Sequence, residues 1–191
     1  MSVVVGADGR SRCGWSGSAP EYLRYHDQEW GTPLHGDHAL FERMCLEGFQ
    51  AGLSWITILR RREIFRAAFA GFDIDAVAAF GDADVARLMS DPGIIRNAAK
   101  VDATIANARV AAELVREEPG ALDALLWSFA PPARAAAPRA AEIPATTPES
   151  AALSRALKKR GFRFVGPTTM YALMQATGMV DDHVEGCWRA R

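Results

Sequence analysis

Hydrophobic residues recur with the period of an α-helix through most of this chain. Residues 36–50 bring Leu40, Met44 and Phe49 towards one face, which is typical of an amphipathic helix. Residues 55–69 repeat the pattern before Gly71, a natural helix stop. Because only Val3–Val5 shows a useful β-branched run, the pattern predicts an all-α fold. Further helices are expected over residues 96–117, 122–129, 149–160 and 168–177.

Polar and breaking residues mark the limits of these elements. Asp73 and Asp82 are expected to be the N-caps of two short helices. Residues 131–148 carry five prolines among alanines, so an irregular, largely extended connection is expected there. Residues 1–11 are expected to form a disordered or extended tail, and residues 12–191 a single helical domain.

The charge balance does not by itself indicate a partner. The 22 basic and 23 acidic side chains give a formal net charge of -1, which is not typical of a protein coated in DNA. DNA binding depends instead on whether basic residues gather on one face. The two basic clusters, Arg60–Arg62 and the group from Arg155 to Arg163, are either solvated helix faces or such a surface.

Composition also bears on the cellular setting. No apolar run approaches the roughly 20 residues that span a bilayer, and Met1–Arg12 lacks the pattern of a secretory signal. Three cysteines, an odd and sparse number, argue against a disulfide framework. They are also too few for the four thiolates of a usual iron–sulfur cluster. We therefore expect a cytoplasmic protein without a membrane partner, and a monomer, since no heptad seam is present.

The segment Gly161–Gly166 joins two expected helices through a turn with a glycine at each end. Glycine allows positive φ, and the free N–H groups of the following helix form a ready anion site. Lys158, Lys159 and Arg160 add positive charge for a phosphate. The segment resembles a helix-hairpin-helix DNA-binding element, but an ordinary corner between two helices remains an equal alternative.

Aromatic residues crowd the N-terminal segment, where Trp15, Tyr22, Tyr25 and Trp30 lie close in sequence. Such residues usually lie in the hydrophobic core, yet their π faces are also suited to stacking on a flat nucleobase. Glu47 lies in a mainly apolar region and therefore either bridges structure or faces a pocket.

Four motifs occur in order along the chain: Arg12–Trp15, Tyr25–Gly31, Leu46–Trp55 and Asp182–Cys187. Together they resemble the bacterial 3-methyladenine DNA glycosylase I family. Asp91–Asn97 and Leu157–Gly166 fit the same pattern, so the resemblance runs from about Arg12 to Cys187. It implies a helix-hairpin-helix glycosylase fold and a role in base-excision repair of alkylated double-stranded DNA.

The resemblance implies one structural zinc ion that joins the two ends of the chain. Its ligands would be Cys13, His26, His183 and Cys187. Two thiolates and two imidazoles suit a closed tetrahedral site with no open position for substrate. His183 and Cys187 are one helical turn apart, whereas Cys13 and His26 need the fold to reach them.

The family pattern also assigns Glu47, Trp55 and Tyr25 to the pocket for the damaged base, with Trp15 and Tyr22 as walls. A methylated, positively charged purine is attracted by aromatic faces and by a carboxylate. After base flipping, Gly52–Leu53 would fill or wedge the gap in the DNA.

The protein needs to contribute little to catalysis, because the charged base of the lesion is already a good leaving group. Glu47 and Asp181 are the candidate catalytic carboxylates, with Glu47 expected mainly to recognise the base. Asp181 stands where we expect asparagine in this family, so it either stabilises the sugar cation or is a loop carboxylate beside the metal-binding segment. No lysine matches a Schiff-base position, which implies a monofunctional hydrolase that releases free 3-methyladenine and leaves an abasic site.

Two other classes of function stay open. The chain could be a non-catalytic module that binds damaged DNA, which binding without base release would reveal. It could also be a related enzyme with lyase action, which borohydride trapping of a protein–DNA adduct would reveal.

Overall fold

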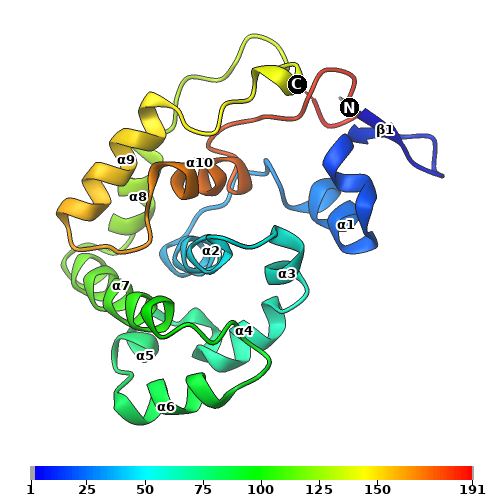
Figure 1. The fold of residues 1–191 in the computed structure, drawn as a ribbon. Coiled ribbons are helices and arrows are strands. Elements are labelled where there is room, and N and C mark those ends of the chain that lie inside the picture. Colours follow the sequence, from blue (N-terminus) through cyan, green and yellow to red (C-terminus); the bar gives the residue numbers. More distant parts are fainter. Residues whose placement is uncertain (1–2, 191) are drawn as a thin grey trace.

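Helix α2 (Asp37–Gln50) lies at the centre of the molecule, with the other helices arranged around it (Figure 1). The structure is a computed structural model and describes residues 3–190. Every residue from Arg43 to Phe49 is buried, so no side of this part of α2 faces solvent. α2 packs against α3 (Trp55–Leu59), α7 (Ala98–Glu117), α8 (Ala121–Trp127) and α10 (Pro167–Ala176).

Short helices on one side of α2 enclose a cluster of phenylalanines. The Phe49 ring on α2 lies 4.7 Å from that of Phe65, and Phe69 stacks on Phe72 with ring centroids 5.5 Å apart. These contacts bury large apolar areas and bind the layer to the central helix. The layer consists of α4 (Arg62–Ala68), η2 (Ala70–Phe72), α5 (Ile74–Ala78) and α6 (Asp82–Ser90).

On the other side of α2, α9 (Pro148–Lys159) packs against α10. An irregular connection leads into α9 and contains only the short helix η3 (Ala140–Glu142) in residues 128–147. The Thr147 side chain accepts a hydrogen bond from the Ser150 N–H, which caps α9 before Pro148 at its first position.

The two ends of the chain lie side by side (Figure 1). Strands β1 (Val3–Val5) and β2 (Ser11–Cys13) pair antiparallel, with Val3 opposite Cys13. Helices η1 (Gly14–Ser18) and α1 (Pro20–Gln28) follow. The Trp188 N–H donates to the Ser11 carbonyl at 2.8 Å, so the last residues are tied to the first strands. Residues 3–11 of the segment expected to be a disordered or extended tail thus belong to a hairpin.

The mainly helical fold is confirmed, with one small two-stranded sheet that the periodicity did not predict. The prediction of a helix over residues 55–69 is wrong in one respect, because the structure divides this segment into α3 and α4. Arg61 at the break has φ -102° and ψ 0°, and its guanidinium donates to the carbonyls of Pro92 and Gly93. Helix α1 was not among the expected helices, although Tyr22 and Tyr25 are three residues apart and Pro20 stands at its first position.

The two aspartates expected to be N-caps differ in the structure. Asp73 caps α5, because its side chain accepts from the Ala76 N–H at 2.8 Å. Asp82 is instead the first residue of α6, and Gly81 occupies the N-cap position. The prediction for Asp82 is therefore wrong by one residue.

Within residues 3–190, no helix combines the length with the apolar character that crossing a membrane requires.

The two aspartates provide a matched test of the capping geometry. Asp73→Ala removes an acceptor for an otherwise unpaired N–H and should lower the free energy of unfolding by about 1 kcal/mol. Asp82→Ala removes no cap and should cost only a few tenths of a kcal/mol from the helix dipole. Urea denaturation of both variants measures the difference, and equal losses would contradict the assignment.

Candidate functional site

A cavity of about 490 Å³ opens between α2, the N-terminal helices and the C-terminal segment. All five residues expected to bind a base line this one cavity: Trp15, Tyr22, Tyr25, Glu47 and Trp55. The sequence separates these residues by up to 40 positions, so the fold brings them together. The other lining residues are Cys13, Gly14, Trp30, Gln50, Ala140, Ile143, Ala172, Gln175, Asp182 and Val184.

Aromatic rings form one wall of the cavity. Trp15 meets the ring of Tyr22 edge to face at 5.5 Å and that of Trp30 at 5.1 Å. Tyr25 and Trp55 lie 5.5 Å apart, tilted by 45°. The Tyr22 hydroxyl accepts from the Ile56 N–H at 2.9 Å and so fixes the start of α3, which carries Trp55. The rings are therefore held in place by their neighbours before any ligand arrives.

The indole N–H of Trp55 is buried and has no hydrogen-bond partner within the described part of the chain. A buried donor without a partner costs free energy in the folded state. Such a donor at the edge of a cavity suits a contact with a polar ligand.

Glu47 projects from the central helix into this apolar setting, with 4% of its surface exposed. Burial raises the pKa of the Glu47 carboxyl to about 7, and the positive charge of nearby Arg43 only partly opposes this. Near neutral pH the side chain is thus poised between its neutral and its charged form. A cationic ligand in the cavity would favour the charged form.

Arg43 stands behind the cavity and connects its parts. Its guanidinium donates to the Tyr25 hydroxyl and to Glu29, both at 3.2 Å, and lies 5.6 Å from the ring centroid of Trp55. Arg62 also donates to Glu29. The hydrogen bonds of Arg43 thus go to Tyr25 and Glu29, while its charge acts on Glu47 through space.

The two neighbouring aspartates of the C-terminal segment occupy different places. Asp181 lies outside the base cavity, with its carboxylate 2.7 Å from Nδ1 of His183, beside a second cavity of about 450 Å³. This position does not favour the catalytic role suggested for Asp181. Asp182, which the sequence reasoning missed, lines the base cavity and is fully buried. Only its inclusion in the motif Asp182–Cys187 pointed to it.

Hydrogen bonds hold Asp182 in one orientation. Its Oδ2 accepts from the Tyr171 hydroxyl and from the Gln175 amide, the latter at 2.8 Å. Its Oδ1 lies 3.0 Å from the guanidinium of Arg134, which comes from the proline-rich connection. The hydrogen bond to Asp182 adds to burial in raising the pKa of Tyr171, so the phenol stays protonated as a donor.

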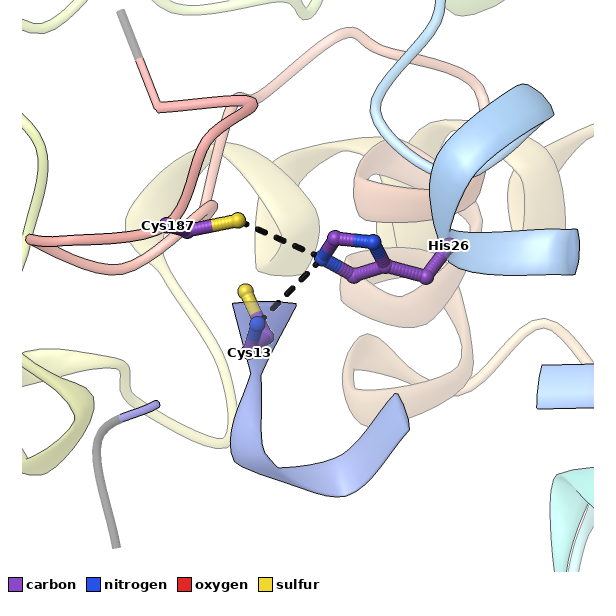
Figure 2. A group of neighbouring side chains, drawn as sticks. All are labelled: Cys13, His26 and Cys187. Atoms are coloured by element: carbon purple, nitrogen blue, oxygen red, sulfur yellow. Dashed lines mark hydrogen bonds between the residues drawn. The ribbon is translucent and has the colours of Figure 1, made fainter. Parts of the chain in front are cut away.

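A cluster of possible metal ligands lies beside the cavity, and Cys13 belongs to both. The ligand atoms of Cys13, His26 and Cys187 all lie within 4.8 Å of one another, and all three residues are buried (Figure 2). Nε2 of His26 is 3.4 Å from the Cys187 sulfur. A hydrogen bond with the Cys13 thiol lowers the pKa of Cys187 to about 4, despite burial, and His26 adds to the effect.

His183, the fourth expected ligand, is not part of this three-residue cluster. Its ring lies 5.0 Å from that of His26, measured between centroids. Nδ1 of His183 is engaged by Asp181, while Nε2 is buried without a hydrogen-bond partner among the described residues. On the other side, Nδ1 of His26 lies 2.9 Å from Asp27, which also accepts from Arg12. Carboxylates thus orient both imidazoles.

The residues expected to contact DNA lie at the surface in two places. Gly52 and Leu53 form an exposed loop after α2, where Gly52 has φ +81° and Leu53 is 40% exposed. The other place is the turn from α9 to α10, beside the exposed residues Lys158, Lys159 and Arg160.

The two glycines of that turn are not alike. Gly161 has φ +98°, as expected for a left-handed position. Gly166 has φ -63° and is the N-cap of α10, so it does not use the positive φ that glycine allows. Phe164 carries positive φ instead, at +55°.

The other basic cluster, Arg60–Arg62, makes hydrogen bonds within the protein, although Arg60 remains exposed. Arg60 donates to Glu21, Arg61 to the Pro92 and Gly93 carbonyls, and Arg62 to Glu29. The break between α3 and α4 turns these three side chains apart. Arg61 and Arg62 are therefore partly buried by these contacts, whereas Arg60 forms an ion pair at the surface.

Comparison with known proteins places these features in a family context. A family model described as methyladenine glycosylase matches residues 15–190. DNA-3-methyladenine glycosylase 1 of Escherichia coli (strain K12) is 51% identical over 178 residues, which cover 92% of this chain and 95% of that protein.

Two solved structures share the fold. A crystal structure of 3-methyladenine DNA glycosylase I matches with a TM-score of 0.89 and 47% identity, over 93% of this chain and 98% of that one. A tyrosine-to-phenylalanine variant of 3-methyladenine DNA glycosylase I, solved in complex with 3-methyladenine, matches with a TM-score of 0.86 and 33% identity. The match covers 93% of this chain and 96% of the other.

Burial of Glu47 predicts a specific dependence of stability on pH. Because the pKa rises from 4.5 to about 7 on folding, the unfolded chain loses this proton first as pH increases. Wild type should therefore lose stability relative to Glu47→Gln between pH 4.5 and about 7 and show a constant difference above. The change should be a few kcal/mol at most, since a tenfold change in the ionisation constant corresponds to about 1.4 kcal/mol. Urea denaturation at several pH values measures it, and a difference independent of pH would refute the buried-carboxyl interpretation.

Proposed function

The chain belongs to the methyladenine glycosylase family, and from this membership and the lining of its cavity we propose that it excises 3-methyladenine from alkylated double-stranded DNA. The observation that carries the proposal is the convergence of five aromatic residues and the buried Glu47 on one cavity. The reaction is hydrolysis of the N-glycosidic bond, which releases the free base and leaves an abasic site.

Recognition rests on the charge of the lesion. Methylation at N3 gives adenine a positive charge, and the rings of Tyr25 and Trp55 attract a cation through their π faces. The ionised form of Glu47 then makes a charge-assisted hydrogen bond with the base. Neutral adenine offers no charge to offset the cost of ionising a buried carboxyl. The cavity therefore discriminates by charge as well as by shape.

Catalysis needs little more than this recognition. The base is flipped out of the helix into the cavity, which costs a few kcal/mol and less for a damaged base. Water adds at the sugar carbon while the base departs with the bonding electrons, through a state with cationic character at the sugar. Asp182 places a carboxylate at the cavity that is paired with Arg134, whereas Asp181 acts on His183.

The enzyme is monofunctional in this proposal. A lyase step needs a lysine amine at the sugar, and the described residues that line the cavity include no lysine. Helices α9 and α10 with their turn form the helix-hairpin-helix that grips the phosphate backbone, and the loop at Gly52–Leu53 enters the gap left by the base. The protein acts as a monomer.

We further propose that Cys13, His26, His183 and Cys187 hold one structural Zn²⁺. Two observations support the fit: the close approach of three ligand atoms, and a fourth buried nitrogen, Nε2 of His183, that has no partner in the described chain. Two thiolates and two imidazoles are the donors that tetrahedral zinc prefers. When bound, the ion would join the N-terminal strands to the C-terminal segment and take no part in the chemistry.

Substitution of Glu47 tests the enzymatic proposal. Glu47→Ala should reduce release of 3-methyladenine from methylated duplex DNA by about 10- to 100-fold, the equivalent of one buried charge-assisted hydrogen bond. Glu42→Gln is the matched control, because Glu42 lies on the same helix but bonds to Arg66 and should leave release unchanged. The released bases are identified by chromatography. An absence of release by the folded wild type would refute the proposal.

Metal analysis tests the zinc proposal separately. Purified protein should contain about one zinc per chain, as a four-ligand site requires. Cys187→Ser and His183→Asn should each lower the zinc content and the unfolding temperature, since metal binding is coupled to folding. Cys45→Ser is the control, because Cys45 is buried in α2 away from the cluster and should leave the zinc content at one. Wild type without zinc, and insensitive to chelators, would contradict the proposal.

A further inference from the structure

Helix α7 lies outside the base cavity, yet it contacts the backbone just before the Gly52–Leu53 loop and the turn between α9 and α10, the two surface elements that the proposed function assigns to DNA. Two buried polar side chains on α7, Lys100 and Asn107, make these contacts, and they are 7% and 5% exposed. They are seven residues apart, which places them on the same face of the helix about 10 Å apart along its axis. Buried polar groups of this kind are costly unless each is satisfied by a partner.

Lys100 fixes the end of the central helix. Its Nζ donates to the carbonyl oxygen of Phe49 at 2.8 Å and to that of Ala51 at 2.6 Å. The last carbonyls of a helix lack partners within the helix and attract a cation. Lys100 therefore holds the backbone just before the exposed loop of Gly52 and Leu53.

Asn107 fixes the turn between α9 and α10. Its side-chain amide donates to the Arg163 carbonyl at 3.0 Å, and its oxygen accepts from the Arg163 N–H at 2.7 Å. This two-point contact determines both the position and the orientation of the peptide at Arg163. The next residue, Phe164, has φ +55°, a conformation that rarely persists unless the surroundings support it.

The end of α2, which leads into the Gly52–Leu53 loop, also lies against the turn between α9 and α10. A Cβ at Gly48, in the last turn of α2, would lie 3.5 Å from the Cβ of Phe164. The end of α2 and the turn are thus neighbours, and both expose an apolar side chain, Leu53 and Phe164, each 40% exposed. A rigid support beneath this junction would set the distance between the loop and the turn.

We propose that Lys100 and Asn107 are positioning residues that hold the Gly52–Leu53 loop and the α9–α10 turn in the relative placement that DNA requires. This inference rests on the proposed function. Neither residue lines the cavity, so they affect the grip on the duplex and leave binding of the free base unaffected. A purely structural role would instead lower stability without separating these two affinities.

The test compares two affinities in each variant: that for a duplex with a tetrahydrofuran abasic site, and that for free 3-methyladenine. Lys100→Met and Asn107→Leu should each weaken duplex binding about tenfold or more, because displacement of a contact element by about 1 Å has effects of this size or greater. Affinity for the free base should stay within about twofold to threefold. Thr104→Val is the matched control, because Thr104 is buried between them on α7 and its hydrogen bonds go to the Lys100 carbonyl and the Cys45 thiol rather than to the loop or the turn.

The double variant decides whether the two residues act together. If they hold one surface, its loss of duplex affinity should be smaller than the product of the single losses. Three results would each overturn the inference. The first is normal duplex binding by both single variants, and the second is a parallel loss of duplex and free-base affinity. The third is a loss of duplex affinity in the double variant that equals the product of the two single losses. If Lys100→Met fails to fold, the Asn107→Leu comparison decides alone. A wild type that binds no abasic duplex would refute the proposed function instead, so the two failures are distinguishable.

Discussion

A carboxylate on the central helix is buried among aromatic rings, and this costly arrangement constrains the structure around it. Glu47 is 4% exposed, and burial raises its pKa to about 7. α2 is enclosed by helices along the part that carries Glu47, so the side chain cannot turn towards solvent. Arg43 is close enough to limit the cost, but it is engaged with Glu29. The negative charge of ionised Glu47 is therefore only partly compensated within the site, and a cationic base would compensate it further.

The walls of the cavity depend on a second constraint, which is the contact between the N-terminal and C-terminal segments of the chain. One wall comes from η1 and α1 and the facing wall from the C-terminal segment. Cys13 lines the cavity and also belongs to the Cys–His–Cys cluster, while Val184 follows His183 directly. Whatever joins Cys13 to Cys187 thus also sets the width of the base site. A structural metal site would in this way influence recognition without touching the ligand.

The limits of sequence-based prediction follow from the range of the interactions involved. The periods of α2, α7, α9 and α10 are local properties, and the structure has these helices close to the expected bounds. The break at Arg61 depends on carbonyls of Pro92 and Gly93, about 30 residues away, and was not visible in the local pattern. The two neighbours Asp181 and Asp182 likewise differ in burial and partners for reasons that only the fold supplies. Family motifs identified the lining of the cavity, but they did not separate these two carboxylates.

The distribution of charge explains how a nearly neutral chain could act on DNA. Arg60–Arg62 are each paired with groups of the protein, and much of the remaining basic surface belongs to the end of α9 and its turn. A small phosphate-binding surface gives modest, sequence-independent affinity, since affinity grows with the number of phosphates neutralised. Selection of a damaged base then has to come from the cavity. The energetic cost of burying Glu47 is consequently the more informative signal of function, and the overall net charge of -1 the less informative one.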